Sequence, residues 1–209
     1  MRKKERALWL IDELKRLYPD AHCALHYKTP FQLLIATILS AQCTDERVNQ
    51  VTSTLFKTYP DAEAFAAASL SELEVAVKPT GFYRNKALSI LETSQKIMLE
   101  HGGETPREMN ELTALRGVGR KTASVVMGNA FGNAEGVVVD THVGRLSRRM
   151  GLTKQTTPEK IEKDLMKVIP RSEWVLFPHL MISHGRAICK SRKAQCEQCD
   201  LSLHCPARV

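Results

Sequence analysis

The chain has 209 residues, of which 43% are hydrophobic and 25% are charged, as in an ordinary globular protein with one domain or two small ones. Thirty Lys and Arg residues face 23 Asp and Glu residues, for a net charge of +7 and a pI near 9.2. A basic balance is typical of nucleic-acid binders. Many basic proteins bind no nucleic acid, so charge alone is only supporting information.

Two segments argue against a membrane span and an export signal. The most apolar stretch, residues 31–41, is too short to cross a bilayer. In the basic N-terminal segment, Asp12 and Glu13 interrupt any apolar run. This segment therefore predicts a surface helix rather than a signal peptide. We expect a soluble intracellular protein without a membrane partner.

The N-terminal quarter of the chain predicts helices. Leucines recur along one face of the segment 6–18, which indicates an amphipathic helix. Thr29 and Pro30 are a favoured N-cap and first helical residue. The residues that follow, up to Leu39, are apolar nearly all round and predict the central helix of a helical domain. The polar segment 40–45 ends that helix and contains capping residues for the next one.

The rest of the chain also predicts helices. Short helices are expected after Asp61 and over 70–77, followed by a turn over 79–86 and a long helix over 87–101 that two glycines end. Later helices are expected from Pro106, over Thr122–Phe131, after Asp140, over Pro158–Val168 and over Trp174–Ile188. Almost nothing predicts a strand, so the expected fold class is all-α.

A glycine-containing turn, Arg116-Gly117-Val118-Gly119, separates two of these helical patterns. Glycine permits positive φ and a close approach of the backbone to a ligand. The N–H groups at the start of the second helix have no partner inside the helix, so they can bind a phosphate oxygen. A helix–hairpin–helix of this kind binds DNA without reading its sequence. Between a third and a half of helices end at a left-handed residue, usually glycine, so a plain helix cap remains an alternative.

Lys121 lies just inside the helix that follows the turn. The positive end of the helix dipole disfavours a cation there, and with partial burial this position should lower the pKa of the amine. A neutral lysine amine is a nucleophile that can form a Schiff base with a sugar carbon. A phosphate-binding lysine is an equally good interpretation of the local sequence.

Asp140 follows the apolar run Val137–Val139 and precedes the next helix. Aspartate is a favoured N-cap, which is the structural interpretation of this residue. The functional interpretation is a carboxylate that stabilises positive charge developing on a sugar. The two interpretations are compatible, because a capped helix end holds its carboxylate rigidly.

The pattern Cys189-x6-Cys196-x2-Cys199-x5-Cys205 is the most specific signal in the chain. The remaining cysteines, Cys23 and Cys43, are isolated, a distribution that favours metal binding over disulfides. Four thiolates can hold zinc or an iron–sulfur cluster. Only one Cys-x2-Cys pair is present, and the unequal loops fit a larger cluster better than a single zinc ion. The loop between the first two cysteines carries three cations, which could face phosphates.

The sequences LRGVGRKTASVV and VVVDTHVGRLSRR resemble the hairpin and aspartate of the helix–hairpin–helix DNA glycosylase superfamily. From about Leu8 to Cys205 the chain is similar to the endonuclease III branch of that superfamily. The resemblance implies two helical domains with a cleft between them. Residues 23–134 would form a six-helix barrel with the hairpin, and residues 1–22 with 135–209 a domain whose four cysteines bind a [4Fe-4S] cluster.

The resemblance also implies roles for single residues. Lys121 would be the Schiff-base nucleophile and Asp140 the catalytic carboxylate. Gln42 would enter DNA where a nucleotide has been flipped out, and Phe82 would be the apolar wedge, for which leucine is the more familiar residue. From the residues alone, a simple cap near Gln42, a core role for Phe82 and a structural role for His142 stay open. The other implied DNA contacts are Arg84, Leu115, Gly117, Val118, Gly119, Arg120, His142, Arg145, Arg192 and Lys193.

These features predict a bifunctional DNA glycosylase and abasic-site lyase of base excision repair. It would act as a monomer on double-stranded DNA with damaged pyrimidines or abasic sites, in the cytoplasm of a bacterium or archaeon and close to the nucleoid. The nearest alternative is a monofunctional glycosylase for mismatched adenine or thymine, which would usually lack the lysine. Adenine glycosylases also carry an added C-terminal domain, whereas this sequence stops four residues after Cys205. A non-catalytic iron–sulfur DNA-binding protein is the third possibility.

Overall fold

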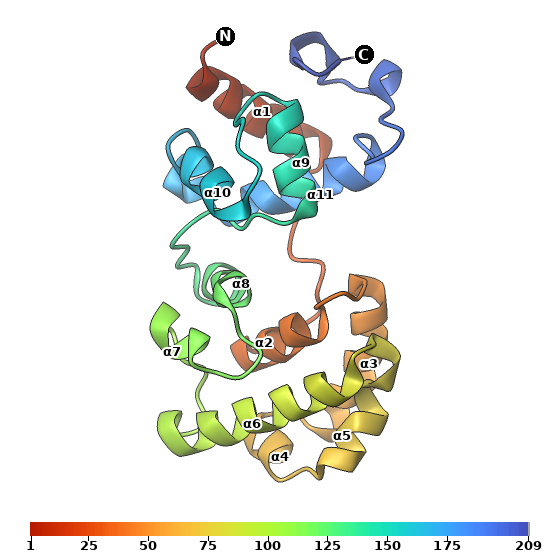
Figure 1. Cartoon of the computed structure of the whole chain (residues 1–209), viewed down its shortest axis with the longest axis vertical. Coiled ribbons are helices and arrows are strands. Elements are labelled where there is room, and N and C mark those ends of the chain that lie inside the picture. Colours follow the sequence, from red (N-terminus) through yellow and green to blue (C-terminus); the bar gives the residue numbers. More distant parts are fainter. Residues whose placement is uncertain (209) are drawn as a thin grey trace. The chain divides into compact units, whose positions relative to one another are not determined.

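Two compact units make up the chain in the computed structural model, which describes residues 1–208 (Figure 1). The central unit is Ala24–Asn133, and the terminal unit combines the N-terminal segment up to Cys23 with the segment from Ala134 onward. The resemblance implied boundaries one residue earlier at the first junction and one residue later at the second. Among the described residues there is no strand, so the predicted all-α class is confirmed.

The central unit contains seven α-helices and a short 3-10 helix, η1, where the resemblance implied six helices. The segment between Tyr59 and η1 forms two separate short helices, because Asp61 and Ser69 each cap a new helix start. The elements are α2 (Pro30–Leu39), α3 (Asp45–Thr58), α4 (Ala62–Ala66), α5 (Leu70–Val77), η1 (Lys78–Thr80), α6 (Tyr83–His101), α7 (Met109–Thr113) and α8 (Arg120–Phe131).

In its described residues, up to residue 208, the terminal unit contains four α-helices and three short 3-10 helices. Its N-terminal helix packs on the last long helix of the chain, so the two ends of the sequence share one core. The elements are α1 (Lys3–Leu17), α9 (Thr141–Arg149), α10 (Pro158–Met166), η2 (Arg171–Glu173), α11 (Leu176–Ala187), η3 (Cys196–Gln198) and η4 (Ser202–His204).

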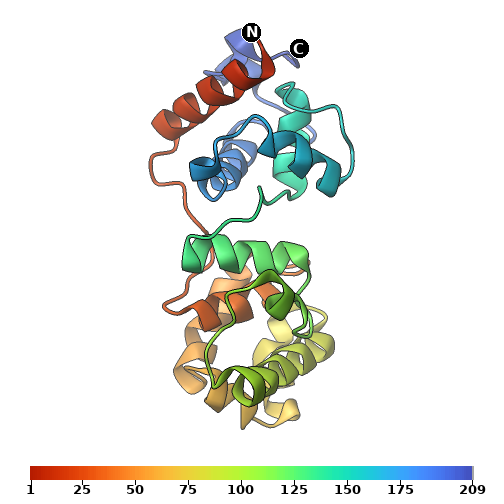
Figure 2. The ribbon, with the colours of Figure 1, turned by 90° about the vertical axis from the view of Figure 1, so that its left-hand side faces the viewer.

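Helix α2 is the centre of the central unit, as its apolar sequence predicted. Every residue from Phe31 to Leu39 is buried. The Thr29 hydroxyl accepts a hydrogen bond from the backbone N–H of Gln32 at 3.2 Å, which confirms the predicted cap. Helices α6 and α8 both pack against α2 (Figure 2). Although α2 is mostly apolar, no helix in the described part of the chain is long and apolar enough to span a membrane.

The core of the terminal unit joins residues from both ends of the sequence. Leu10 and Leu14 of α1 are almost fully buried, together with Phe177 of α11 and Leu201 near the C-terminus. Full burial of each such side chain contributes about 1.5–3 kcal/mol. Residues of α9 and of the cysteine-bearing tail pack in this shared core, which holds both segments in place.

Several helices start away from the predicted residue: α1 at Lys3, α7 at Met109, α8 at Arg120 and α11 at Leu176, against residues 6, 106, 122 and 174, and α6 differs as well. Helix α6 begins at Tyr83 rather than at residue 87, because Phe82 adopts a left-handed conformation and takes the N-cap position. The sequence Thr157-Pro158 does start α10, but the Thr157 side chain makes no capping hydrogen bond. Because α6 begins at Tyr83, the predicted turn over residues 79–86 is shorter and Lys86 lies inside a helix.

Gly144 sits inside α9 and is buried. A Cβ at this position would lie 3.5 Å from Ile161 Cδ1 and 3.7 Å from Val139 Cγ1, which is ordinary van der Waals contact. Glycine in a helix interior is about 1 kcal/mol less favourable than alanine. Gly144→Ala should therefore raise the thermal unfolding temperature.

Gly185 provides the matched control, because a Cβ there would lie 2.7 Å from His142 Nδ1. Gly185→Ala should lower the unfolding temperature in the same scan. A lower unfolding temperature for Gly144→Ala would contradict this account of the α9 packing.

Candidate functional site

Helices α7 and α8 form the predicted helix–hairpin–helix, and α6 holds the turn between them. Thr93 Oγ1 of α6 donates a hydrogen bond to the carbonyl oxygen of Arg116 at 2.9 Å. The Arg116 guanidinium also pairs with the Glu92 carboxylate at 3.1 Å. Leu115 and Val118 are buried, at 3% and 5% exposure, and pack the turn against the rest of the central unit. Both can reach a ligand only through their backbone groups.

The two glycines of the turn have different reasons to be glycine. Gly117 has φ = +76°, and a Cβ there would lie 2.9 Å from the Cβ and Oγ of Ser89. Conformation and space therefore both require glycine at this position. Gly119 has an ordinary φ of −88°, and a Cβ there would meet no heavy atom within 4 Å. What Gly119 leaves open is the space beside the start of α8.

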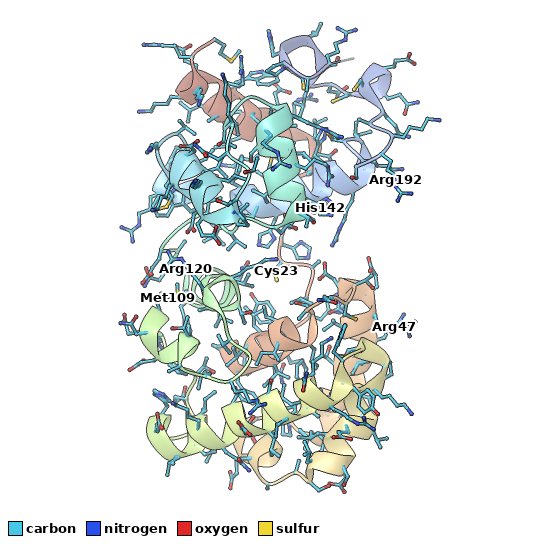
Figure 3. The ribbon with its side chains drawn as sticks, in the orientation of Figure 1. Cys23, Arg47, Met109, Arg120, His142 and Arg192 are labelled. Atoms are coloured by element: carbon cyan, nitrogen blue, oxygen red, sulfur yellow. The ribbon has the colours of Figure 1, made fainter. Side chains whose placement is uncertain are left out.

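The amino terminus of α8 is a surface that can bind an anion. Gly119 is its N-cap residue, and no side chain caps the helix. The first-turn N–H groups and the helix dipole favour a negatively charged group there. Arg120 and Lys121 are both exposed on this turn (Arg120 is labelled in Figure 3). We expected partial burial of Lys121; it is exposed because the buried face of α8 begins at Ala123.

Asp140 of the terminal unit caps α9. Its Oδ1 accepts a hydrogen bond from the backbone N–H of Val143 at 2.7 Å, as the N-cap interpretation predicted. The side chain is partly exposed, and Oδ2 takes no part in the cap. The carboxylate is therefore held in one orientation by the backbone.

Gln42 and Phe82 share an unusual backbone conformation. They are the two non-glycine residues with positive φ in residues 1–208, at 53° and 48°. A left-handed conformation costs a non-glycine residue on the order of 1–3 kcal/mol and occurs often at functional sites. Phe82 is also 65% exposed, so it is not the core aromatic that the sequence left open. Gln42 is exposed as well, at the end of the loop before Thr44 caps α3.

Arg145 and His142 contact each other on α9. The Arg145 guanidinium donates to the carbonyl oxygens of Cys189 at 2.9 Å and Gly185 at 3.3 Å, and its Nη2 lies 3.3 Å from His142 Nδ1. These contacts hold α9 against the end of α11. Arg145, a candidate DNA contact in the sequence, thus makes its described polar contacts inside the terminal unit.

Arg149 is a residue whose role the sequence did not reveal. Its guanidinium donates to the carbonyl oxygens of Lys190 at 2.8 Å and Ser191 at 2.9 Å, and to Cys189 Sγ at 3.3 Å. It lies one helical turn after Arg145, so the two arginines face the same segment. That spacing is the signal by which it could have been found.

The basic candidates elsewhere lie on the surface. Arg192 and Lys193 are exposed on the loop after α11 (Arg192 is labelled in Figure 3). Arg84 is exposed at the start of α6, with its guanidinium 5.5 Å from the centre of the Tyr83 ring. All three side chains are exposed and therefore accessible to a phosphate group.

The four cysteines of the tail are half-buried and not in disulfides. Burial raises the pKa of the Cys199 thiol, and the electrostatic effect of the other three cysteines raises it further. Burial likewise raises the pKa of Cys205, with Cys189 and Cys196 adding to the effect. The four sulfur atoms therefore lie within electrostatic reach of one another. In residues 1–208, no three His, Cys, Asp or Glu side chains converge tightly enough to hold a single metal ion.

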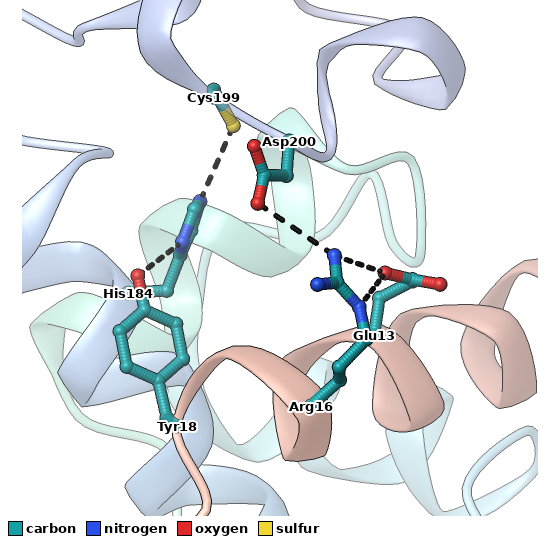
Figure 4. A network of polar contacts seen from close by, with 6 residues as sticks. All are labelled: Glu13, Arg16, Tyr18, His184, Cys199 and Asp200. Carbon is teal, nitrogen blue, oxygen red and sulfur yellow. Dashed lines mark hydrogen bonds and ion pairs between the residues drawn. The ribbon is translucent and has the colours of Figure 1, made fainter.

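A chain of polar contacts runs from α1 to Cys199 (Figure 4). The Tyr18 hydroxyl lies 3.0 Å from His184 Nδ1, and His184 Nε2 lies 3.7 Å from Cys199 Sγ. Burial lowers the pKa of His184 to about 4, so its imidazole is neutral at pH 7. The Arg16 guanidinium of α1 pairs with the Asp200 carboxylate at 3.6 Å. These contacts anchor the cysteine tail to the N-terminal helix.

Comparisons with known proteins agree with this geometry. The HhH-GPD superfamily of base excision DNA repair proteins matches residues 35–171. Endonuclease III of Synechocystis sp. is 55% identical over 98% of this chain and 94% of that protein. Endonuclease III of Bacillus subtilis is 43% identical over 93% and 89%. The chain belongs to the endonuclease III family.

Solved structures of the endonuclease III family support the same assignment. A trapped endonuclease III–DNA covalent intermediate and a non-covalent endonuclease III–DNA complex both match with a TM-score of 0.92 and 44% identity, over 99% of this chain and 97% of each matched chain. A thermostable thymine-DNA glycosylase has the same fold, with a TM-score of 0.86 at 24% identity. The activity of the chain is that of a bifunctional glycosylase and lyase of base excision repair.

The two hairpin glycines predict separable defects in this endonuclease III family member. Gly117→Ala should lower the free energy of unfolding by about 1–2 kcal/mol, because alanine is strained at positive φ. Gly119→Ala should leave stability within about 0.5 kcal/mol but weaken binding to abasic-site DNA, because its Cβ would occupy the space where a phosphate approaches. Thermal unfolding and fluorescence anisotropy measure the two effects. Equal stability losses in both variants would contradict the distinction.

Proposed function

We propose that Lys121 is the nucleophile of the glycosylase and lyase reactions. The single observation that carries this proposal is the position of Lys121: the residue is exposed on the first turn of α8, beside backbone N–H groups that no side chain caps. A lysine so placed can approach a sugar whose phosphate the hairpin binds. The trapped covalent endonuclease III–DNA intermediate among the matched structures supports a covalent mechanism.

The proposed reaction has three steps: attack at C1′, formation of a Schiff base and β-elimination. The Lys121 amine attacks C1′ of a flipped nucleotide while the bond from C1′ to the base breaks, and the base leaves with the electron pair and a proton. The attached amine gives one proton to the departing base and a second to the ring oxygen O4′ as the bond between C1′ and O4′ breaks, which opens the sugar and leaves a Schiff base. Removal of a proton from C2′ then expels the 3′ phosphate by β-elimination. Asp140 stabilises the positive charge on the sugar and assists proton transfer.

The substrate is double-stranded DNA that contains damaged pyrimidines or abasic sites, bound by a monomer. The backbone amides from Leu115 to Arg120 bind phosphate. Gln42 and Phe82 insert where the nucleotide is flipped, and His142 contacts the pocket that receives it. Support for the insertion role comes from the exposed, left-handed conformations of Gln42 and Phe82. Arg84, Arg192 and Lys193 add phosphate contacts.

The four tail cysteines are proposed to bind a [4Fe-4S] cluster, which the endonuclease III family is known to carry. The fit rests on four half-buried sulfur atoms that interact electrostatically and on the Arg149 guanidinium donating to Cys189 Sγ. When Cys199 is a metal-bound thiolate it can only accept, so His184 Nε2–H donates to it and Nδ1 accepts from Tyr18. The bound cluster would fix the fold of the basic loop that carries Arg192 and Lys193.

A monofunctional mismatch glycosylase, the alternative weighed from the sequence, differs from the proposed mechanism in its nucleophile. Such an enzyme removes a base with water as the nucleophile and forms no Schiff base. Borohydride reduction separates the two, because it traps only a Schiff base as a covalent protein–DNA product. A wild-type enzyme that removes bases without any trapped product would contradict the nucleophile role of Lys121.

Substitution of the two proposed catalytic residues gives a sharp test. Lys121→Gln should still bind abasic-site DNA but lose strand cleavage and borohydride trapping by on the order of 10³-fold or more, because the amine is gone. Asp140→Asn should keep stability, because asparagine caps as well as aspartate, while base removal slows by about 10²–10³-fold. Asp140→Ala should in addition lose about 1 kcal/mol of stability. Unchanged cleavage by Lys121→Gln would refute the nucleophile assignment.

The cluster proposal predicts the iron content of two cysteine variants. Cys199→Ala should lose most of its iron and unfold at a lower temperature, because one ligand of the cluster is removed. Cys43→Ser is the matched control, since Cys43 lies in the central unit, and should retain its iron. Iron analysis of the purified proteins measures both. Full iron occupancy in Cys199→Ala would exclude Cys199 as a ligand.

A further inference from the structure

Lys86 is a buried cation that the proposed mechanism does not use. Its side chain lies in the first turns of α6 with only 5% of the residue exposed. The ammonium Nζ donates a hydrogen bond to the carbonyl oxygen of Thr80 at 2.7 Å. Burial lowers the pKa of this amine, as expected for a charge removed from water. Its neighbours Ala87 and Ile90 are fully buried and apolar.

The bonds of Lys86 close a ring around the loop that presents Phe82. Its backbone N–H donates to the carbonyl oxygen of Phe82 at 3.2 Å, while its side chain binds Thr80 on the other side of the same loop. Thr80 is itself 2% exposed and fixed by a hydrogen bond to the carbonyl oxygen of Val77 at 2.8 Å. One residue thus holds both ends of the segment from Thr80 to Phe82.

The enclosed backbone is in a strained state that needs such a support. Gly81 has φ = 70° and ψ = 159°, a region that essentially only glycine occupies. Phe82 follows at φ = 48° and ψ = 31°, a conformation unfavourable for an aromatic residue. Without a fixed carbonyl at Thr80, rotation in this segment would relieve the strain and turn Phe82 away. Lys86 also interacts electrostatically with Cys43, the neighbour of Gln42 in the other strained loop.

Stability alone does not account for a lysine here. Removing a charge from water is unfavourable, and an apolar residue of similar volume is often as stable or more stable at such a site. Methionine would match the surrounding apolar side chains. The effect that methionine cannot reproduce is the hydrogen bond to the Thr80 carbonyl.

We propose that Lys86 is a positioning residue for nucleotide flipping: it clamps the segment from Thr80 to Phe82 so that the Phe82 ring is held ready for insertion into the duplex. This inference rests on the proposed wedge role of Phe82. Lys86 touches no reacting atom, so its effect is confined to the flipping step. Chemistry at Lys121 on a nucleotide that is already extrahelical does not depend on it.

The test compares one lesion in two settings under single-turnover conditions. Flipping is costly for a base-paired lesion and much less so for one placed opposite an abasic site, where stacking and pairing are already weak. Lys86→Met should slow base removal from the paired lesion by about tenfold, which corresponds to about 1.4 kcal/mol. The same variant should slow removal of the unpaired lesion by less than about threefold.

A double-mutant cycle with Phe82→Ala identifies the path of the effect. If Lys86 acts through Phe82, adding Lys86→Met to Phe82→Ala should cause no further loss on the paired lesion. Lys96→Met is the matched control on the same helix, where a partly exposed lysine pairs with Glu100 at 3.5 Å. It should leave both rates unchanged.

Three results would overturn the proposal: an equal loss of rate on both substrates, a loss that persists in the Phe82→Ala background, or no loss at all. Thermal unfolding of each variant accompanies the kinetics. If Lys86→Met unfolds below the assay temperature, Lys86→Gln replaces it, since its shorter neutral side chain also gives up the Thr80 contact. Borohydride trapping on the unpaired substrate should remain normal in the variants, whereas failure of the Lys121 assignment would show in the wild type as well.

Discussion

The exposed amino terminus of α8 is the physical feature on which the proposed function depends. Its backbone N–H groups have no side-chain cap, and the space beside Gly119 in the preceding turn is open. The turn is fixed from behind by Thr93, by the buried side chains of Leu115 and Val118, and by Gly117, whose conformation no other residue adopts easily. The proposed sequence-independent contact with the DNA backbone depends on this packing, and so does the position of Lys121.

The terminal unit is organised around α9. Asp140 caps the N-terminus of this helix. Arg145 and Arg149 donate hydrogen bonds to carbonyl groups at the start of the cysteine tail. The same short helix therefore orients a carboxylate at one end and holds the proposed cluster loop along its side. Arg16 of α1 and Tyr18, the C-cap residue of that helix, anchor the tail from the opposite end of the sequence. Loss of the tail should thus disturb α9 as well as the basic loop.

Local sequence rules predicted the parts of the fold that depend on neighbours in sequence. The cap at Thr29, the burial of α2 and the cap at Asp140 follow from residue type and hydrophobic period, and all are present. What the sequence could not reveal depends on three-dimensional partners. The left-handed conformation of Phe82 shifted the start of α6, Lys121 is exposed rather than partly buried, and Arg149 binds carbonyls of a loop 41 and 42 residues away. The burial of Lys86 could not be predicted from the sequence for the same reason, since it depends on the Thr80 carbonyl and on the surrounding core.

The central claim is that one amine, that of Lys121, becomes covalently attached to the sugar. The most direct measurement is borohydride reduction of the wild-type enzyme on lesion-bearing DNA, followed by nuclease and protease digestion and mass spectrometry of the modified peptide. The account predicts a reduced sugar adduct on Lys121 and on no other residue. An adduct on another lysine or on the N-terminal amine, with Lys121 unmodified, would contradict it.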